Sequence, residues 1–159
     1  MLQGIILLCL TAMFFQDLRY REINIALPII LFISGYYLLY KKIGQTAFYI
    51  GSYNLILFLV IFLCMVIYMV IKMKSLVNPF QNYFGLGDLL FYIAVTPLFF
   101  LSGYLMFFIA SMVFTVVCYF AFKKYIAKDS IPLAGFSSAL LFVLVVLDIL
   151  SVKNIIIAL

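Results

Sequence analysis

An uncharged run covers residues 89–122 and limits what this chain can fold into more than any other feature. A membrane helix needs about 20 apolar residues, with a range of about 17–25. The run is therefore too long for one crossing, and Ser102-Gly103 is the break that we expect within it. Of all residues, 69% are hydrophobic and 9% are charged, whereas soluble domains are about 45–50% apolar and about 25% charged. The sequence predicts an all-α integral membrane protein.

The apolar segments predict a bundle of about six transmembrane helices. The first segment spans only about 22 Å at the helical rise per residue. Either its helix continues past Asp17 or the bilayer is locally thinner. The length suits one domain, a single transmembrane domain over residues 1–159. The predicted segments are residues 2–16, 25–40, 53–71, the two parts of 89–122, and 131–150.

The basic residues predict the orientation of the bundle. With six crossings, seven basic residues fall on one side and three on the other, and positively charged loops stay in the cytoplasm. Both termini are then expected outside the inner or plasma membrane, and Asp17 and Asp88 on its cytoplasmic side. The seven are Arg19, Arg21, Lys72, Lys74, Lys123, Lys124 and Lys128, and the three are Lys41, Lys42 and Lys153.

The absence of histidine excludes several kinds of site. Serine-histidine and cysteine-histidine catalysis both need it. Cys9, Cys64 and Cys118 lie singly in apolar segments and form no C-x-x-C pair, so neither a zinc site nor a disulfide framework is indicated. We expect no metal and no organic cofactor. The net charge of +5 is scattered over the connections between apolar segments and does not indicate nucleic acid as a partner.

Two aspartates lie where apolar and polar segments meet. Asp17 ends the first apolar segment, before Leu18-Arg19-Tyr20-Arg21, and Asp88 closes Gly85-Leu86-Gly87-Asp88. Ionisable groups in such places are costly and commonly functional. Two carboxyl groups can hydrolyse a peptide when one is ionised and accepts a proton from water while the other is protonated and polarises the carbonyl. Like charges held close together force this division. The pattern predicts a catalytic pair.

Each aspartate also has a structural interpretation. Asp88 could only cap the N-terminus of the fourth segment, where free N–H groups and the helix dipole favour a carboxylate. Asp17 could pair with Arg19 or Arg21 at a helix end. The two aspartates are nevertheless expected on one side of the membrane, and this favours the catalytic interpretation over the two structural ones.

These residues resemble a known family. Gly-x-Gly-Asp at a membrane boundary, preceded by Asp-x-Arg-x-Arg-x-Ile-Asn, resembles the type IV prepilin peptidases and the archaeal preflagellin peptidases. Ile131-Pro132-Leu133-Ala134-Gly135-Phe136 resembles the family's Ile-Pro-rich start of the last helix. The resemblance implies a six-pass aspartyl protease whose active site faces the cytoplasm. Asp17 and Asp88 would be its catalytic residues, and Gly85 and Gly87 would shape the active-site loop.

The resemblance also implies a substrate class. Family members remove a short basic leader from pilin-like precursors, usually after a glycine, so that the product can assemble into a type IV pilus or a secretion pseudopilus. Asn24 directly follows Ile23, where the family usually has Ile-Pro-Asn, and Leu90 stands where it usually has lysine. Many bacterial members also carry a cysteine-paired domain linked to methylation of the product. We expect proteolysis without methyl transfer here, with pilin-like precursors and membrane lipid as partners.

Two other functions stay open at the level of sequence. A proton- or cation-coupled carrier could use two membrane carboxylates, although transport sites are expected near the bilayer midplane. A catalytically inactive relative could bind pilin-like helices without cutting them, and Leu90 and the missing proline allow this. Asp148 is either a third polar element of the site or a residue near the outer boundary beside Lys153. The outward direction of the last segment favours the boundary.

Overall fold

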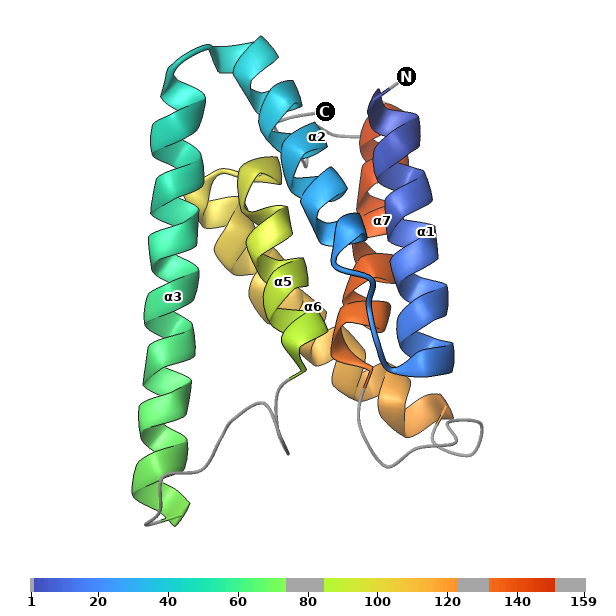
Figure 1. Cartoon of the computed structure of the whole chain (residues 1–159), viewed down its shortest axis with the longest axis vertical. Helices are drawn as coiled ribbons and strands as arrows, with labels where there is room; N and C mark the ends of the chain where they lie inside the picture. Colours follow the sequence, from blue (N-terminus) through green and yellow to red (C-terminus); the bar gives the residue numbers. More distant parts are fainter. Residues whose placement is uncertain (1, 74–84, 123–131, 151–159) are drawn as a thin grey trace.

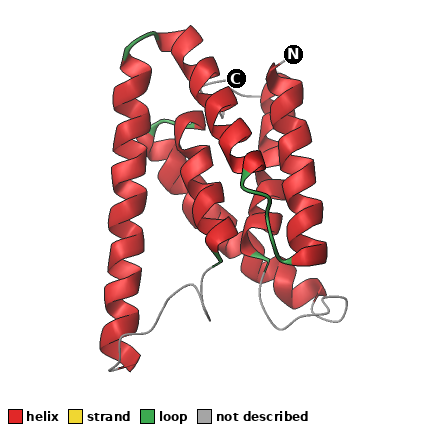
Figure 2. Ribbon diagram, viewed as in Figure 1, coloured by secondary structure: helices red, strands yellow, loops and turns green. Residues whose placement is uncertain are grey.

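The computed structural model describes residues 2–73, 85–122 and 132–150. Within these ranges the secondary structure is entirely helical (Figure 2), which confirms the predicted all-α class for this part of the chain. Its elements are α1 (Leu2–Tyr20), α2 (Ala26–Ile43), α3 (Thr46–Met73), α5 (Leu86–Val95), the 3-10 turn η1 (Thr96–Leu98), α6 (Leu101–Phe122) and α7 (Leu133–Ile149).

Four helices, α1, α2, α3 and α6, are long and apolar enough to cross a membrane. The apolar helices α5 and α7 are shorter. The 10 residues of α5 extend about 15 Å, which is half of a hydrocarbon core. Six complete crossings therefore remain a prediction. So does the orientation of the termini, because half of the basic residues used to derive it lie outside the described residues: Lys74, Lys123, Lys124, Lys128 and Lys153.

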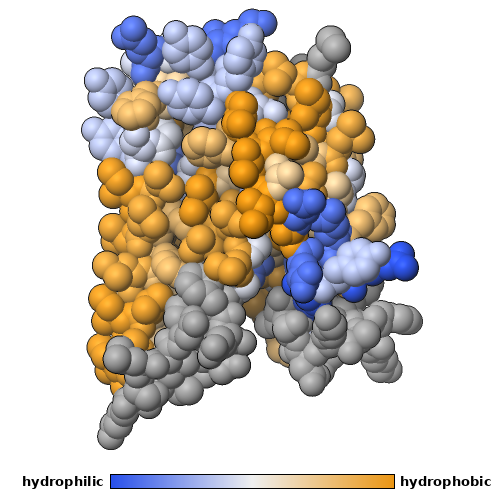
Figure 3. Space-filling view, in the orientation of Figure 1, coloured by the Kyte–Doolittle hydropathy of each residue, from blue (hydrophilic) through white to orange (hydrophobic). Residues whose placement is uncertain are grey.

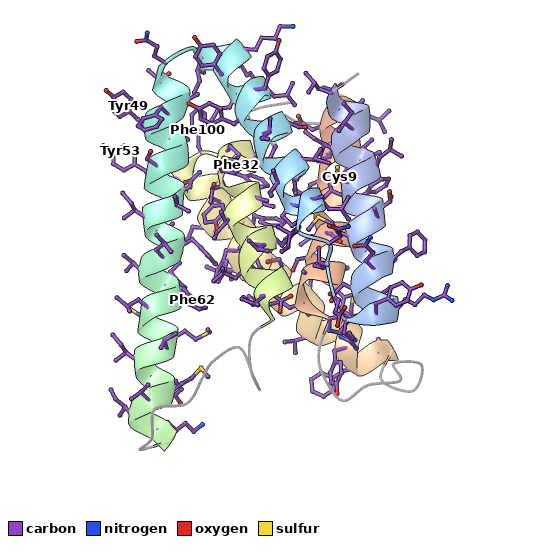
Figure 4. The ribbon with its side chains drawn as sticks, in the orientation of Figure 1. Cys9, Phe32, Tyr49, Tyr53, Phe62 and Phe100 are labelled. Atoms are coloured by element: carbon purple, nitrogen blue, oxygen red, sulfur yellow. The ribbon has the colours of Figure 1, made fainter. Side chains whose placement is uncertain are left out.

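The surface is apolar, as a lipid environment requires. Hydrophobic side chains cover the middle of the face seen in Figure 3, and polar ones gather at its upper end and near the lower end of α1. Tyr49 and Tyr53 of α3 point away from the bundle, whereas Phe62 points inward (Figure 4). An exposed apolar area of this extent marks contact with another apolar phase. The fold is compatible with a helical membrane protein.

The break in residues 89–122 differs from the predicted one. The prediction of two helices is confirmed, but its position at Ser102-Gly103 is wrong, because these residues lie in the first turn of α6. The chain instead leaves α5 after Val95, passes through η1 with Pro97, and is extended at Phe99. Proline has no backbone N–H and clashes with the preceding helical turn. The break therefore lies at Pro97, and Gly103 is inside the following helix, α6.

The α5–α6 break is enclosed by α2 and α3. The side-chain amide nitrogen of Asn54, on α3, donates hydrogen bonds to the carbonyl oxygens of Thr96 at 2.8 Å and Phe99 at 2.6 Å. A Cβ atom added to Gly35 of α2 would lie 2.9 Å from Leu98. Irregular backbone at membrane depth is tolerated only where protein groups satisfy it. At this break the side-chain amide of Asn54 supplies the hydrogen-bond donors.

Three helix ends meet at one end of the bundle. α1 continues past Asp17 to Tyr20. This is the first of the two alternatives given for the short first segment, a helix longer than the apolar stretch. α1 packs along α7 and α2, and α2 along α5. The end of α1 and the starts of α5 and α7 therefore gather at the lower end, while α1 begins and α7 ends at the opposite end (Figure 1). The aspartates are carried by the gathered ends.

An aromatic core holds α5 in place. The rings of Phe58 on α3 and Tyr92 on α5 are stacked with centroids 5.9 Å apart. The ring of Phe108 on α6 meets Tyr92 edge to face at 5.0 Å. Phe58 and Tyr92 are almost fully buried, and aromatic pairs of this geometry stabilise beyond the area that they bury. The short helix that carries Asp88 is thus packed between two long ones.

Candidate active site

Asp17 is buried against the last described helix. It lies on α1, one turn before the helix ends, and only 7% of its surface is exposed. Its Oδ2 accepts a hydrogen bond from the backbone N–H of Gly135 on α7 at 2.5 Å. Arg19 is exposed and its guanidinium lies over the ring of Tyr20. The terminal nitrogens of Arg21 have no hydrogen-bond partner in the described ranges. Asp17 thus bonds α7 rather than either arginine.

Asp88 lies in the first turn of α5 and accepts two backbone hydrogen bonds. Its Oδ2 accepts from the N–H of Gly85 at 3.0 Å, and its Oδ1 accepts from the N–H of Ala134 at 2.7 Å. The first bond is a helix cap, because Gly85 is the N-cap and Asp88 the third helical residue. The capping interpretation is therefore correct for one oxygen. The other oxygen reaches a different helix.

The two carboxyl groups meet at the N-terminus of α7. Ala134 and Gly135 are consecutive, and each donates its backbone N–H to one aspartate. The first amides of a helix have no partner within the helix, and this end carries partial positive charge. Because consecutive Cα atoms are about 3.8 Å apart, both carboxyl groups lie close together, and they interact electrostatically. The structure brings Asp17 and Asp88 into one cluster.

Gly85 and Gly87 both lie where a side chain would collide with the site. A Cβ atom at Gly85 would lie 3.0 Å from Oδ2 of Asp88, and one at Gly87 would lie 3.0 Å from Cδ1 of Ile23. Glycine permits such close approach because it has no Cβ. Gly87 therefore allows the α1–α2 connection to pack directly on α5. The predicted glycines line the site, one against the carboxylate and one against the connection that follows Asp17.

Gly135 is a residue whose contact with the site the sequence reasoning missed. A Cβ atom there would lie 2.9 Å from Oδ2 and 3.2 Å from Cβ of Asp17, so only glycine fits without a shift. The signal was available in Pro132, because proline just before or within the first helical turn marks a helix start. The exposed amides of that turn are natural partners for a carboxylate.

The connection between α1 and α2 is fixed at both ends without the missing proline. The backbone N–H of Asn24 donates to Oε1 of Gln16 at 3.0 Å, and Oδ1 of Asn24 accepts from the N–H of Ala26 at 3.1 Å. The second bond is an Asx turn that leads into α2, whose N-cap is Ile25. Leu90, where the resemblance would lead us to expect a lysine, is half-buried. A cation near the carboxylates is instead provided by Arg21, which interacts electrostatically with both.

A buried polar network joins α5, α6 and α7 one turn beyond Asp88. The hydroxyl of Tyr92 forms hydrogen bonds with Oγ of Ser111 at 2.8 Å and Oγ of Ser137 at 3.1 Å. The hydroxyl of Tyr104 donates to the carbonyl oxygen of Tyr92 at 3.1 Å. These bonds place the first turns of α7 relative to α5. They hold in register the two helices whose ends carry Asp88 and the amides that it contacts.

The remaining polar candidates lie away from the carboxyl cluster. Asp148 lies in the last turn of α7, thirteen positions after Gly135, or about 20 Å along the helix. It therefore does not join Asp17 and Asp88. Cys9, Cys64 and Cys118 are free thiols. Over residues 2–73, 85–122 and 132–150, no group of three or more His, Cys, Asp or Glu side chains could hold a metal ion.

No protein-family model, curated protein or solved structure matches this chain.

Proposed function

We propose that this chain is a membrane aspartyl endopeptidase that removes the short basic leader from pilin-like precursors at the cytoplasmic face of the inner or plasma membrane. One observation carries the proposal. Asp17 and Asp88, far apart in the sequence, bond consecutive amides of α7 and form one carboxyl cluster. The chain's motifs resemble those of prepilin and preflagellin peptidases, and this resemblance supports the choice of substrate.

In the proposed reaction the two carboxyl groups share one proton. The ionised member accepts a proton from water, and the water oxygen adds to the scissile carbonyl carbon. The protonated member donates its proton to the carbonyl oxygen. Collapse of this tetrahedral intermediate breaks the C–N bond and protonates the leaving amine. Because the groups are coupled, the ionisation states belong to the pair rather than to either residue. No metal or organic cofactor is required.

The position of the cluster suits a substrate that is itself a membrane helix. The cluster lies at the end of the bundle where α1 ends and α5 and α7 begin (Figure 1), beside an outer surface rich in exposed apolar side chains. The apolar segment of a precursor can lie in lipid along this surface, while its basic leader and the peptide bond before the helix extend across the bundle end. A buried site near the middle of the bundle would instead suit a transported ion.

The test is cleavage of a pilin-like precursor from the same genome, co-expressed with the wild type or with Asp17→Asn or Asp88→Asn. Each change removes an acid/base group and should lower cleavage by about 100- to 10,000-fold. Asp148→Asn, at the far end of α7, is the matched control and should retain cleavage. Mass spectrometry locates the new N-terminus. Full cleavage by Asp88→Asn, with insertion verified for each variant, would refute the acid/base pair.

A further inference from the structure

Arg21 occupies a backbone position that normally favours glycine. It follows α1 with φ 60°, and in residues 2–73, 85–122 and 132–150 no other residue besides glycine has a positive φ. Its N–H donates to the carbonyl oxygen of Asp17 at 3.1 Å, which closes the last turn of α1. Helices commonly end on such a left-handed residue, and glycine adopts it without a Cβ penalty. Strained residues of this kind cluster at functional sites, so the side chain of Arg21 needs an explanation.

The terminal nitrogens of Arg21 are buried, and no described residue accepts a hydrogen bond from them. A buried charged donor is costly unless it is bonded, and arginine has no way to lose its charge. Arg19, two residues earlier, is exposed. Two arginines in the same turn thus have different environments, and of these two only Arg21 has buried donors that no described residue uses.

The charge balance of the cluster favours a neutral ligand. Arg21 interacts electrostatically with both Asp17 and Asp88. A carboxyl pair that shares one proton carries a charge of about −1, and the guanidinium cancels it. An anionic group would therefore meet no net positive charge. A peptide carbonyl oxygen, which is neutral and accepts hydrogen bonds, suits donors that lie beside a peptide-cleaving pair.

We propose that Arg21 binds the substrate backbone by donating hydrogen bonds from its terminal nitrogens to a carbonyl oxygen within one residue of the scissile bond. This inference rests on the proposed function. It makes Arg21 a third functional residue beside Asp17 and Asp88. No described residue uses these donors, which are closed to solvent in the free protein. A peptide that displaces the groups covering them satisfies the donors, and the binding energy holds the scissile bond against the two carboxyl groups.

The first experiment measures kcat/KM of the full chain in phosphatidylcholine liposomes. The probe is a synthetic peptide with a lysine-rich leader, a glycine and an apolar segment. Arg21→Met keeps most of the side-chain length and removes the donors, so kcat/KM should fall about 100-fold, as for other preorganised donors. Arg21→Lys should restore part of the loss. Arg19→Met is the matched control and should stay within about twofold. An equal loss for Arg19→Met would overturn the proposal.

A thioamide scan separates substrate contact from a structural role. Thioamides are placed, one at a time, at the scissile carbonyl and its two neighbours, because sulfur accepts hydrogen bonds more weakly than oxygen. At the contacted position, the thioamide should lower the cleavage rate of wild type by a larger factor than that of Arg21→Met. The thioamide and the Arg21→Met change would remove the same hydrogen bond, so their effects would not add. Additive effects at all three positions would overturn the proposal. So would a loss seen only when phosphatidylglycerol is added, which would assign Arg21 to a lipid phosphate.

Binding without turnover separates this inference from the proposed function. The same peptide is titrated onto Asp88→Asn and onto Asp88→Asn combined with Arg21→Met. We expect binding about tenfold weaker in the double variant. Equal binding would refute the role of Arg21 even if wild type cleaves the peptide. Weaker binding together with an inactive wild type would instead uphold the peptide contact and refute the endopeptidase.

Discussion

Replacing Gly135 with alanine tests whether the backbone of α7 positions Asp17. The added Cβ would lie 2.9 Å from Oδ2, 3.2 Å from Cβ and 3.4 Å from Cγ of Asp17. The first distance is shorter than van der Waals contact. The oxygen that the added Cβ would contact is the same one that accepts the N–H of Gly135. The carboxyl group therefore has to move away from the amide that holds it, and the geometry of the pair changes.

The magnitude follows from the hydrogen bond that is lost. A hydrogen bond to a charged group contributes about 1.5–3 kcal/mol, and about 1.4 kcal/mol corresponds to a tenfold change in rate. Activity should therefore fall by about 10- to 150-fold. Alanine is favoured over glycine in helices by up to about 1 kcal/mol, which offsets part of the lost stability. We expect the unfolding temperature in detergent to change by only a few degrees while activity falls sharply.

The assay is peptide cleavage in liposomes, paired with thermal unfolding of the same samples. Gly51→Ala is the matched control, because a Cβ there meets no atom within 4 Å; it should retain activity. Activity of Gly135→Ala within about twofold of wild type would show that the α7 backbone does not position Asp17. A large drop in unfolding temperature for Gly135→Ala would show that the effect is on folding rather than on the site.

Three further changes test the supports of the site. Asn54→Leu leaves two buried carbonyl oxygens at the α5–α6 break without donors and should lower the free energy of unfolding by about 2–5 kcal/mol, measured by denaturation in mixed micelles; a change below about 0.5 kcal/mol would contradict the role of Asn54. Tyr92→Phe removes two hydrogen bonds between helices and should lower the free energy of unfolding by about 1–3 kcal/mol. Full cleavage activity at low temperature would show that the network stabilises the fold and does not position the site. Gly87→Ala collides with Ile23 and should lower cleavage about tenfold by shifting the α1–α2 connection; adding Ile23→Ala should restore it, and a failed rescue would contradict the steric explanation.

The boundaries of the helices show where local patterns were sufficient. The all-α class and the first three helices followed from apolar segments, although α3 begins at Thr46, before the predicted residue 53. The break between α5 and α6 did not follow. Ser102-Gly103 has the more flexible backbone, but the break lies at Pro97. There Asn54 satisfies the carbonyl oxygens of Thr96 and Phe99, and Gly35 allows α2 to approach. Pro97 was a local signal for this position, but the partners that satisfy the break lie on other helices and left no signal beside it in the sequence.

The sequence by itself determined an apolar helical chain with one carboxyl group at the end of its first segment and another at the start of its fourth. Hydropathy and charge are local properties, and they can be read along the chain. Only the tertiary structure decided that Asp17 bonds an amide 118 positions away and Asp88 bonds the preceding amide, 46 positions away. It likewise decided that the terminal nitrogens of Arg21 are buried while Arg19 is exposed. These outcomes depend on how α1 and α5 pack against the start of α7, and packing of distant segments has no local signature.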